Sequence, residues 1–236
     1  MQSTELRALL IDGGNTAVKV GELSGERVEL IARLPTEEVI ERPELLLQKV
    51  KGFKGRVGIA SVVPKLSKVL RELFPEGEFV GLMGELPVKI PYKGEMGADR
   101  VANILGGSSL FKSFIVASLG TATVIDVVVN GEFRGGFILP GVRLMARSLK
   151  EGTALLPQVK ELRNFRPGNE TKECIEAGIL RGIGGAISSV RREFLGLPLI
   201  LTGGDAGAIY PLTGGILIEE LTLLGIGEYL KYKGGR

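Results

Sequence analysis

The sequence predicts an α/β protein built from two lobes of similar plan. Apolar stretches of strand length alternate with helical stretches along the 236 residues. A strand, a glycine turn and a returning strand occur near the N-terminus and again about 106 residues later. Glycine supplies 35 of the 236 residues, about twice the usual ~7%, without a collagen period, so it belongs to tight turns inside structure. We expect lobes at 1–110 and 111–236, with a cleft between them.

The first lobe opens with an apolar strand at 6–11 that ends in the turn Asp12-Gly13-Gly14-Asn15-Thr16. A crossing rich in proline and glycine, at 74–97, leads to a helix at about 98–110, which we interpret as the hinge between the lobes. The other elements expected here are strands at 17–22, 27–32 and 56–62, and helices at 44–50 and 64–74, the second begun by its own proline.

The second lobe repeats this opening. A strand at 113–119, the turn Gly120-Thr121-Ala122-Thr123 and a strand at 124–130 come first, and Asn130-Gly131 predicts a hairpin into a strand at 132–139. The remaining expected elements are helices at 142–150 and 172–194, a short strand at 198–201, a glycine turn at 202–206 and a last helix at 215–232.

The absence of histidine restricts the chemistry more than any other feature. Without histidine, and with Cys174 as the only cysteine, the chain has no Ser-His-Asp or Cys-His nucleophile system and no zinc site of the usual kind. A metal would have to bind oxygen ligands, as magnesium and potassium-like ions do, and we expect a general base to be a carboxylate.

The composition also argues against two classes of partner. The net charge of +3 comes from interleaved basic and acidic residues, aromatic residues make up 6% and tryptophan is absent, so we expect no nucleic-acid partner. No apolar run approaches the ~20 residues of a membrane helix, and the first residues lack the layout of a secretory signal. We therefore expect a cytoplasmic protein without a membrane partner.

Glycine turns after three apolar strands are the main functional signal. Such a turn lets backbone N–H groups approach phosphate oxygens, and Asn15, Thr16 and Thr121 could add donors. Hairpin geometry alone would explain any one turn, but three together favour a bound polyphosphate. Neither a P-loop nor a Rossmann glycine motif is present in the sequence, so the nucleotide-binding plan is a different one.

Two charged clusters accompany these turns, and each has two interpretations. Asp12 beside phosphate-binding amides would require a cation such as magnesium, or it could simply cap its turn. Lys19 could neutralise a phosphate or point to solvent. In Gly97-Ala98-Asp99-Arg100, the aspartate could cap the helix and the arginine could lie on the surface, whereas a position between the lobes favours a functional role.

The motifs resemble, in order and approximate spacing over nearly the whole chain, those of type III pantothenate kinase. The motifs are Asp12-x-Gly14-Asn15-Thr16, Gly97-x-Asp99-Arg100, Gly120-Thr121-Ala122, Gly135-Gly136 with Pro140-Gly141, and Thr202-Gly203-Gly204. This resemblance implies an actin-like ATPase fold, with two ribonuclease-H-like lobes, mixed sheets flanked by helices and a nucleotide cleft between the lobes. It also implies a homodimer that phosphorylates pantothenate with ATP and Mg²⁺, the first step of coenzyme A synthesis.

The resemblance implies a role for individual residues. Asp99 would be the general base on the pantothenate hydroxyl, Asp12 would lie near magnesium, and Thr171 would reach pantothenate in the partner subunit. The residues expected to contact pantothenate are Tyr92, Gly97, Ala98, Asp99, Arg100 and Thr171. The residues expected to contact ATP are Asp12, Gly13, Gly14, Asn15, Thr16, Ala17, Val18, Lys19, Thr121, Gly203 and Gly204, the last two beside the adenosine.

One position departs from the family pattern. The family carries a monovalent-cation ligand, an aspartate, two residues before the glycine of its Gly-Thr-Ala turn, and this chain has Ser118 there. A hydroxyl does not supply the charge of that ligand, so activation by K⁺ or NH₄⁺ is in doubt. Asp126 on the following strand could compensate, although a carboxylate at a strand end or facing outward is the favoured interpretation.

Two alternatives to pantothenate phosphorylation stay open at this point. The chain could be a non-catalytic regulatory or binding protein on the same nucleotide-binding fold. It could also be a kinase for another small acid or sugar. The retention of Asp12 together with Asp99 and Arg100 favours catalysis, because a binding protein does not need a base beside a carboxylate clamp.

Overall fold

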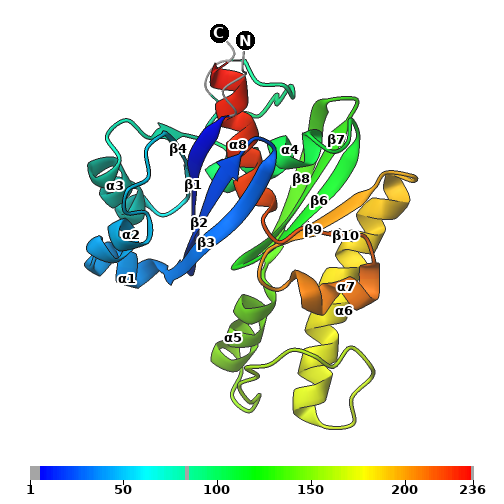
Figure 1. Ribbon diagram of the computed structural model, residues 1–236. Coiled ribbons are helices and arrows are strands. Elements are labelled where there is room, and N and C mark those ends of the chain that lie inside the picture. The colour runs from blue at the N-terminus through cyan, green and yellow to red at the C-terminus, as the bar shows by residue number, and fades with distance from the viewer. Residues whose placement is uncertain (1–5, 83–84, 235–236) are drawn as a thin grey trace. The chain divides into compact units, whose positions relative to one another are not determined.

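The computed structural model describes residues 6–82 and 85–234, which divide into two compact units (Figure 1). Within these residues, the first unit comprises the chain up to Lys112, residues 131–133 and the segment from Glu220 onward. The second unit comprises 113–130 and 134–219. The lobes expected at 1–110 and 111–236 remain a prediction; in this division the segment from Glu220 onward groups with the first unit.

The first unit is built on a five-stranded mixed sheet in the order β3-β2-β1-β4-β5. Neighbours β1–β2 and β2–β3 are antiparallel, whereas β1–β4 and β4–β5 are parallel. The strands are β1 (Arg7–Gly13), β2 (Ala17–Ser24), β3 (Arg27–Pro35), β4 (Arg56–Ser61) and β5 (Glu78–Phe79).

Helices cover both faces of this sheet, as the continuous burial of Ala8–Ile11 requires. Leu9 and Ile11 pack with Leu66 and Leu70 of α3 in one core, which α1 and α2 also enter. On the other side, α8 packs against β1 and β4 and also against α4. The helices of this unit are α1 (Thr36–Glu41), α2 (Glu44–Lys49), α3 (Pro64–Leu73), α4 (Ala98–Ser108) and α8 (Leu221–Gly234).

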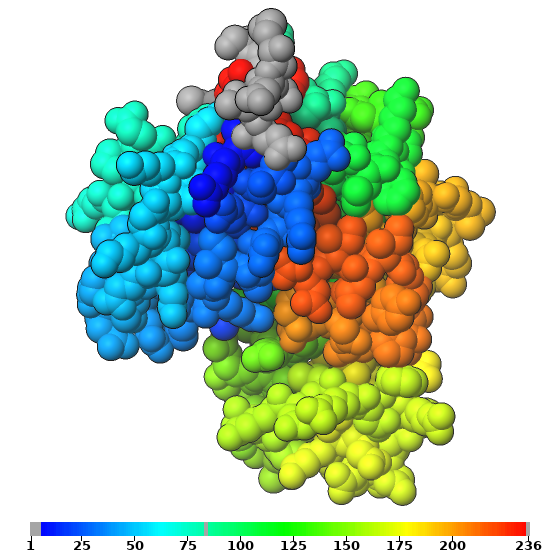
Figure 2. Space-filling model, viewed as in Figure 1, coloured from blue at the N-terminus to red at the C-terminus, as the bar shows by residue number. Residues whose placement is uncertain are grey.

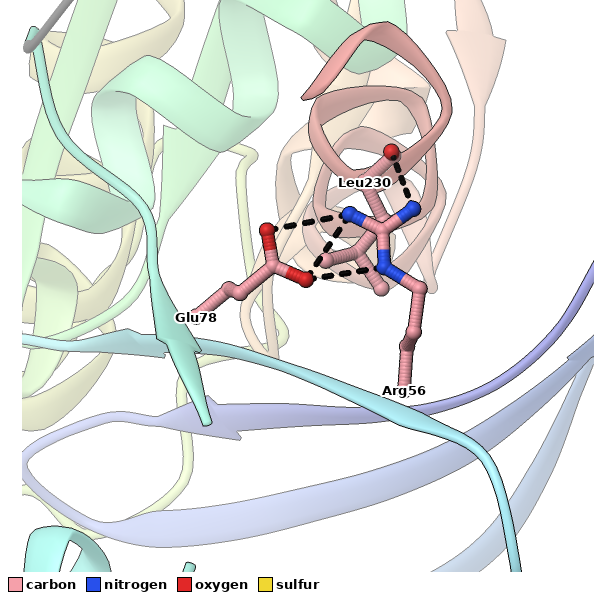
Figure 3. Close-up of polar contacts among 3 residues, drawn as sticks. All are labelled: Arg56, Glu78 and Leu230. Carbon is pink, nitrogen blue, oxygen red and sulfur yellow. Dashed lines mark hydrogen bonds and ion pairs between the residues drawn. The ribbon is translucent and has the colours of Figure 1, made fainter. Parts of the chain in front are cut away.

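An arginine on β4 fastens the C-terminal helix α8 to the first sheet (Figure 3). The Arg56 guanidinium donates to both carboxylate oxygens of Glu78 at 2.8 and 3.0 Å. Its remaining nitrogen donates to the carbonyl of Leu230 in α8 at 2.8 Å. The apolar face of α8 is buried, including Leu221 and Ile226 at 0% exposure. These contacts explain why the C-terminal segment belongs to the first unit.

The second unit repeats the plan of the first. Its sheet has the order β10-β9-β6-β7-β8, so its first strand again pairs antiparallel with the next and parallel with a later one. The predicted duplication is confirmed at the level of topology. The strands are β6 (Phe114–Leu119), β7 (Ala122–Val129), β8 (Glu132–Pro140), β9 (Leu199–Thr202) and β10 (Ile216–Leu217), and the helices are α5 (Val142–Gly152), α6 (Thr171–Glu193) and α7 (Ala206–Thr213).

The prediction of a last helix at 215–232 is wrong at its start. Gly214 and Gly215 have φ of +59° and +113°, which are not helical, and β10 pairs parallel with β9 before α8 begins at Leu221. The sequence reading also missed α1 and α7, which are six and eight residues long. Across the described ranges, no helix combines the length and apolarity needed to cross a membrane.

Candidate functional site

The β1–β2 hairpin holds the first glycine turn in one conformation. The Gly14 N–H donates to the carbonyl of Ala17 at 3.1 Å and closes the turn. Thr36, at the start of α1, fixes it from outside: its hydroxyl donates to the Gly14 carbonyl at 2.7 Å and its N–H to the Thr16 carbonyl at 3.1 Å. Asn15 and Thr16 remain exposed at the tip, so their polar groups are available to a ligand.

Close packing explains the glycine that precedes this tip. A Cβ at Gly13 would lie 2.8 Å from Leu66 Cδ2 and 3.1 Å from Ser61 Oγ. The Gly13 carbonyl accepts the N–H of Val62 at 3.1 Å, which extends the pairing of β1 with β4. A side chain at position 13 would therefore require Leu66 or Ser61 to shift at the end of β1, next to Asp12.

Asp99 folds back onto the first turn of α4. Its Oδ1 accepts the backbone N–H of Arg100 at 2.8 Å, which holds the carboxylate at the first turn of a helix whose N-cap is Gly97. A Cβ at Gly97 would lie 2.7 Å from the same Oδ1. The glycine two residues earlier thus leaves the space that this carboxylate occupies.

Asp12 and Asp99 influence each other electrostatically within the first unit. Burial raises the pKa of the Asp12 carboxyl to about 7; Lys19, its cross-strand partner, opposes this rise and the charge of Asp99 adds to it. Burial also raises the pKa of Asp99, against the lowering effect of the Arg100 N–H and guanidinium. The charge of Asp99, at the start of α4, is therefore felt by Asp12, at the end of β1.

Arg100 is buried beside two aromatic rings, so the interpretation of a surface arginine is wrong. Its guanidinium donates to the Tyr92 hydroxyl at 3.3 Å and lies 5.3 Å from the centre of the Tyr92 ring. It lies 6.0 Å from the centre of the Phe133 ring, and the two rings are 6.0 Å apart at 60°. Tyr92 and Arg100, both expected at the pantothenate site, are thus neighbours in the structure.

In the second unit, the two other glycine turns lie side by side. The Leu119 carbonyl accepts the N–H of Asp205 at 3.0 Å, and a Cβ at Gly203, whose φ is +95°, would lie 2.4 Å from that oxygen. Gly141 also contacts the turn at 120–123, since its N–H donates to the Thr121 carbonyl at 2.9 Å. Thr121, Gly203 and Gly204 therefore belong to one cluster of tight backbone turns.

Three polar side chains of this unit belong to the positions considered for a monovalent cation and for pantothenate. Ser118 is the penultimate residue of β6 and pairs in register with Val124 and Thr202. Asp126 lies inside β7 and is 2% exposed, so the interpretation of an outward or strand-end carboxylate is wrong. Thr171 is the first residue of α6, and its side chain is exposed.

The first unit offers oxygen ligands of the kind that magnesium binds. Asp12 and Asp99 are two carboxylates whose mutual repulsion a cation would relieve. No group of three or more His, Cys, Asp or Glu side chains able to hold a metal occurs among the described residues. This donor set suits a magnesium ion that keeps most of its coordination for phosphate oxygens and water, so Asp12 fits the expected role.

Two residues that shape the site were missed from sequence. Thr36 follows Pro35 and precedes Glu37 and Glu38, a pattern typical of a helix start that could have drawn attention to it. Phe133 lies 33 residues after Arg100 in a strand of ordinary composition, and no signal in the sequence joins the two.

Comparison with known proteins identifies related sequences and folds. The family model for type III pantothenate kinase matches residues 8–193. The type III pantothenate kinase of Thermosipho melanesiensis is 34% identical over 92% of this chain and 96% of its own. In fold, the chain resembles a Baf family transcriptional activator from Campylobacter jejuni (TM-score 0.67, 21% identity, 97% of this chain and 100% of the other). It also resembles a glucokinase of the ROK family from Streptomyces griseus, solved with glucose and AMPPNP (TM-score 0.55, 13% identity, 94% and 98% covered). The two mixed sheets flanked by helices, together with these likenesses, confirm the expected two-lobed ATPase fold.

Proposed function

We propose that this chain, which belongs to the type III pantothenate kinase family, transfers the γ-phosphoryl group of ATP to the primary alcohol of pantothenate. The products are ADP and 4′-phosphopantothenate. The observation that carries the proposal is the pairing of Asp99 with a buried Arg100 at the start of α4, in the electrostatic reach of Asp12. Family membership favours this kinase over the non-catalytic and other-substrate alternatives.

Asp99 acts as the general base in this proposal. The alcohol oxygen attacks the γ-phosphorus, the bond from that phosphorus to the β–γ bridging oxygen breaks, and the alcohol proton passes to the Asp99 carboxylate. The raised pKa of Asp99 supports the role, because a carboxylate that burial has made more basic accepts a proton more readily. The Arg100 N–H holds one oxygen, which orients the carboxylate.

Arg100 binds the carboxylate of pantothenate. A guanidinium presents two parallel N–H donors to a carboxylate, which fixes both distance and direction. Tyr92 lies beside Arg100, and its hydroxyl, which accepts from Arg100, keeps the arginine from turning away. Gly97 and Ala98 form the start of the helix against which the substrate lies, and the first-turn amides face it.

ATP contacts the hairpin residues from Asp12 to Lys19 and, in the second unit, Thr121, Gly203 and Gly204. The exposed Asn15, Thr16 and Thr121 support this assignment, since they can donate to phosphate oxygens. Asp12 would hold Mg²⁺, which when bound neutralises charge on the phosphates. With Ser118 in place of a carboxylate, we propose that the enzyme works without a monovalent cation.

We also propose that the protein is a homodimer in which Thr171 reaches the partner's pantothenate. The segment at 153–170, yellow-green in Figure 2, lies on the surface of the second unit, and Thr171, which follows it, is exposed. The exposed apolar side chains of this unit include Phe137 at 47%, Ile138 at 63% and Leu155 at 93%. Sedimentation equilibrium tests the dimer, and a monomer at micromolar concentration with full activity contradicts it.

Steady-state kinetics with ATP, Mg²⁺ and pantothenate tests the function. We expect Asp99→Asn to lower kcat by about 10²–10⁴-fold with little change in ATP binding, because the variant cannot accept the proton. Glu95→Gln is the matched control, since it neutralises an exposed carboxylate four residues earlier. An Asp99→Asn enzyme with the turnover of the wild type removes the base assignment, and a wild type that phosphorylates another acid instead removes the substrate assignment.

A further inference from the structure

We infer that Phe133 is a positioning residue for Arg100 and thereby sets the affinity for pantothenate. This inference rests on the proposed function, in which Arg100 binds the substrate carboxylate. Phe133 does not belong to the substrate motifs, and it is the second residue of β8. Residues 131–133 nevertheless group with the first unit, which contains Tyr92 and Arg100.

Backbone hydrogen bonds hold Phe133 beside the segment that leads to Tyr92. The N–H of Lys89 donates to the Gly131 carbonyl at 3.0 Å, and the N–H of Phe133 donates to the Lys89 carbonyl at 2.9 Å. These bonds form a short parallel bridge in which Lys89 pairs with Glu132. Tyr92 follows three residues after the bridge, so the two aromatic residues reach Arg100 from two segments that are hydrogen-bonded to each other.

The turn that precedes the bridge fixes the position of the Phe133 backbone. Asn130 and Gly131 have φ of +54° and +73°, the pair of positive values typical of a tight two-residue hairpin turn. The Gly131 N–H donates to the Lys112 carbonyl at 2.8 Å. The position of the Phe133 backbone is therefore held by hydrogen bonds on both sides of the turn. The ion pair of Lys89 with Glu132 adds little, because the lysine is largely exposed.

The two rings limit the motion of the Arg100 guanidinium. Phe133 and Arg100 are 5% and 7% exposed, so the contact of ring and cation is shielded from water. A cation near an aromatic face is attracted by the electron density of the ring, and the attraction is larger when the pair is desolvated. A guanidinium held in this way loses less freedom when it binds a carboxylate, so the rings favour binding.

This arrangement predicts a selective kinetic effect. Phe133→Leu removes the ring face but keeps an apolar side chain, so we expect the KM for pantothenate to rise about 3- to 30-fold. The kcat and the KM for ATP should stay within about twofold, because Phe133 contacts Arg100 and Tyr92, which are assigned to pantothenate and not to the base or to ATP. Phe133→Tyr keeps the ring and should restore a pantothenate KM near that of the wild type. Phe133→Met is a second variant without a ring, should Phe133→Leu fail to fold.

A matched control uses another pair of arginine and phenylalanine in the same unit. Arg71 lies 3.9 Å from the centre of the Phe79 ring. Phe79→Leu makes the same chemical change at an arginine outside the site, and we expect no change in the pantothenate KM. Equal rises in this KM for Phe79→Leu and Phe133→Leu would overturn the inference, because they would indicate a general loss of stability.

A measurement without substrates separates this inference from the proposed function. In the NMR spectrum of the free protein, the Nε–Hε signal of Arg100, assigned by its loss in Arg100→Lys, should shift and broaden in Phe133→Leu. The signal should be retained in Phe133→Tyr. An unchanged Arg100 signal in Phe133→Leu, or an unchanged pantothenate KM, overturns the inference. A wild type without pantothenate kinase activity refutes the proposed function, whereas the NMR result still decides whether Phe133 holds Arg100.

Discussion

The raised pKa of Asp12 predicts that this carboxylate destabilises the metal-free protein at alkaline pH. A carboxyl whose folded pKa lies above its unfolded value stabilises the fold below the unfolded pKa, and that stability is lost as the pH rises through the folded pKa. For Asp12 the two values are 3.8 and about 7. Asp12→Asn removes the titration and keeps nearly the same shape, so the variant should be less sensitive to pH than the wild type.

The size of the effect follows from the same two values. A difference of about three pKa units corresponds to roughly 4 kcal/mol of unfolding free energy when the titration is complete, at about 1.36 kcal/mol per unit. About 2–3 kcal/mol of this falls between pH 5 and pH 8.5, since part of the loss has already occurred at pH 5. We therefore expect the free energy of unfolding to drop that much further between these pH values in the wild type than in Asp12→Asn.

Urea unfolding at pH 5 and pH 8.5 in the presence of EDTA measures this difference. Glu26→Gln, at an exposed carboxylate in the turn between β2 and β3, is the matched control and should follow the wild type. Adding Mg²⁺ at pH 8.5 should stabilise the wild type and leave Asp12→Asn unchanged, because the metal needs the ionised carboxylate. Equal pH dependence in the wild type and Asp12→Asn would refute the reasoning.

Three further perturbations test other parts of the account. Gly97→Ala places a Cβ 2.7 Å from Asp99 Oδ1, so we expect at least about a tenfold loss of kcat in steady-state assays; an unchanged kcat would show that the carboxylate does not need this position. The wild type should change less than about twofold in activity between Na⁺ and K⁺ buffers, whereas Ser118→Asp should gain activity in K⁺; a wild type that requires K⁺ contradicts this. Arg56→Met should lower the free energy of unfolding in urea by about 1–2 kcal/mol. This loss should exceed that of Glu78→Gln, because Arg56→Met also removes a hydrogen bond to α8. A loss below about 0.5 kcal/mol argues against the role of Arg56 in holding α8 to the sheet.

The duplicated sheet was predictable because its signals are local. Each half opens with an apolar strand, a glycine turn and a returning strand, and these three features lie within about 20 residues. The helix that begins at Ala98 was predictable for the same reason, since a glycine and an aspartate mark its first turn. The order of the strands repeats in the two units, as the duplication suggested.

The errors occurred where distant contacts decide the local structure. Residues 216–217 form a strand because β9 lies beside them, and a Cβ at Gly215 would lie 2.8 Å from the carbonyl of Leu199. The helix α7 contains Pro211, and a proline inside a segment usually indicates that the segment is not helical. The membership of α8 in the first unit depends on Arg56, more than 160 residues earlier in the chain.

The candidate site could be proposed from the sequence in its residues, but not in its environment. The motifs indicated Asp12, Asp99 and Arg100, but the burial of Arg100 depends on segments that are separate in sequence. The contact with Phe133 depends on the bridge at Lys89, which no pattern of residue types announces. Sequence motifs thus give the candidate groups for the proposed chemistry, while tertiary contacts determine their pKa values and their freedom to move.

Analysis of the reaction products tests the central claim most directly. The purified protein is incubated with ATP labelled in the γ-phosphate, Mg²⁺ and pantothenate, and the labelled product is identified by mass spectrometry. We expect one label per pantothenate, on its primary alcohol, and little label released to water. Label found only in inorganic phosphate, or no transfer at all by the folded wild type, would contradict the claim that Asp99 activates the pantothenate alcohol.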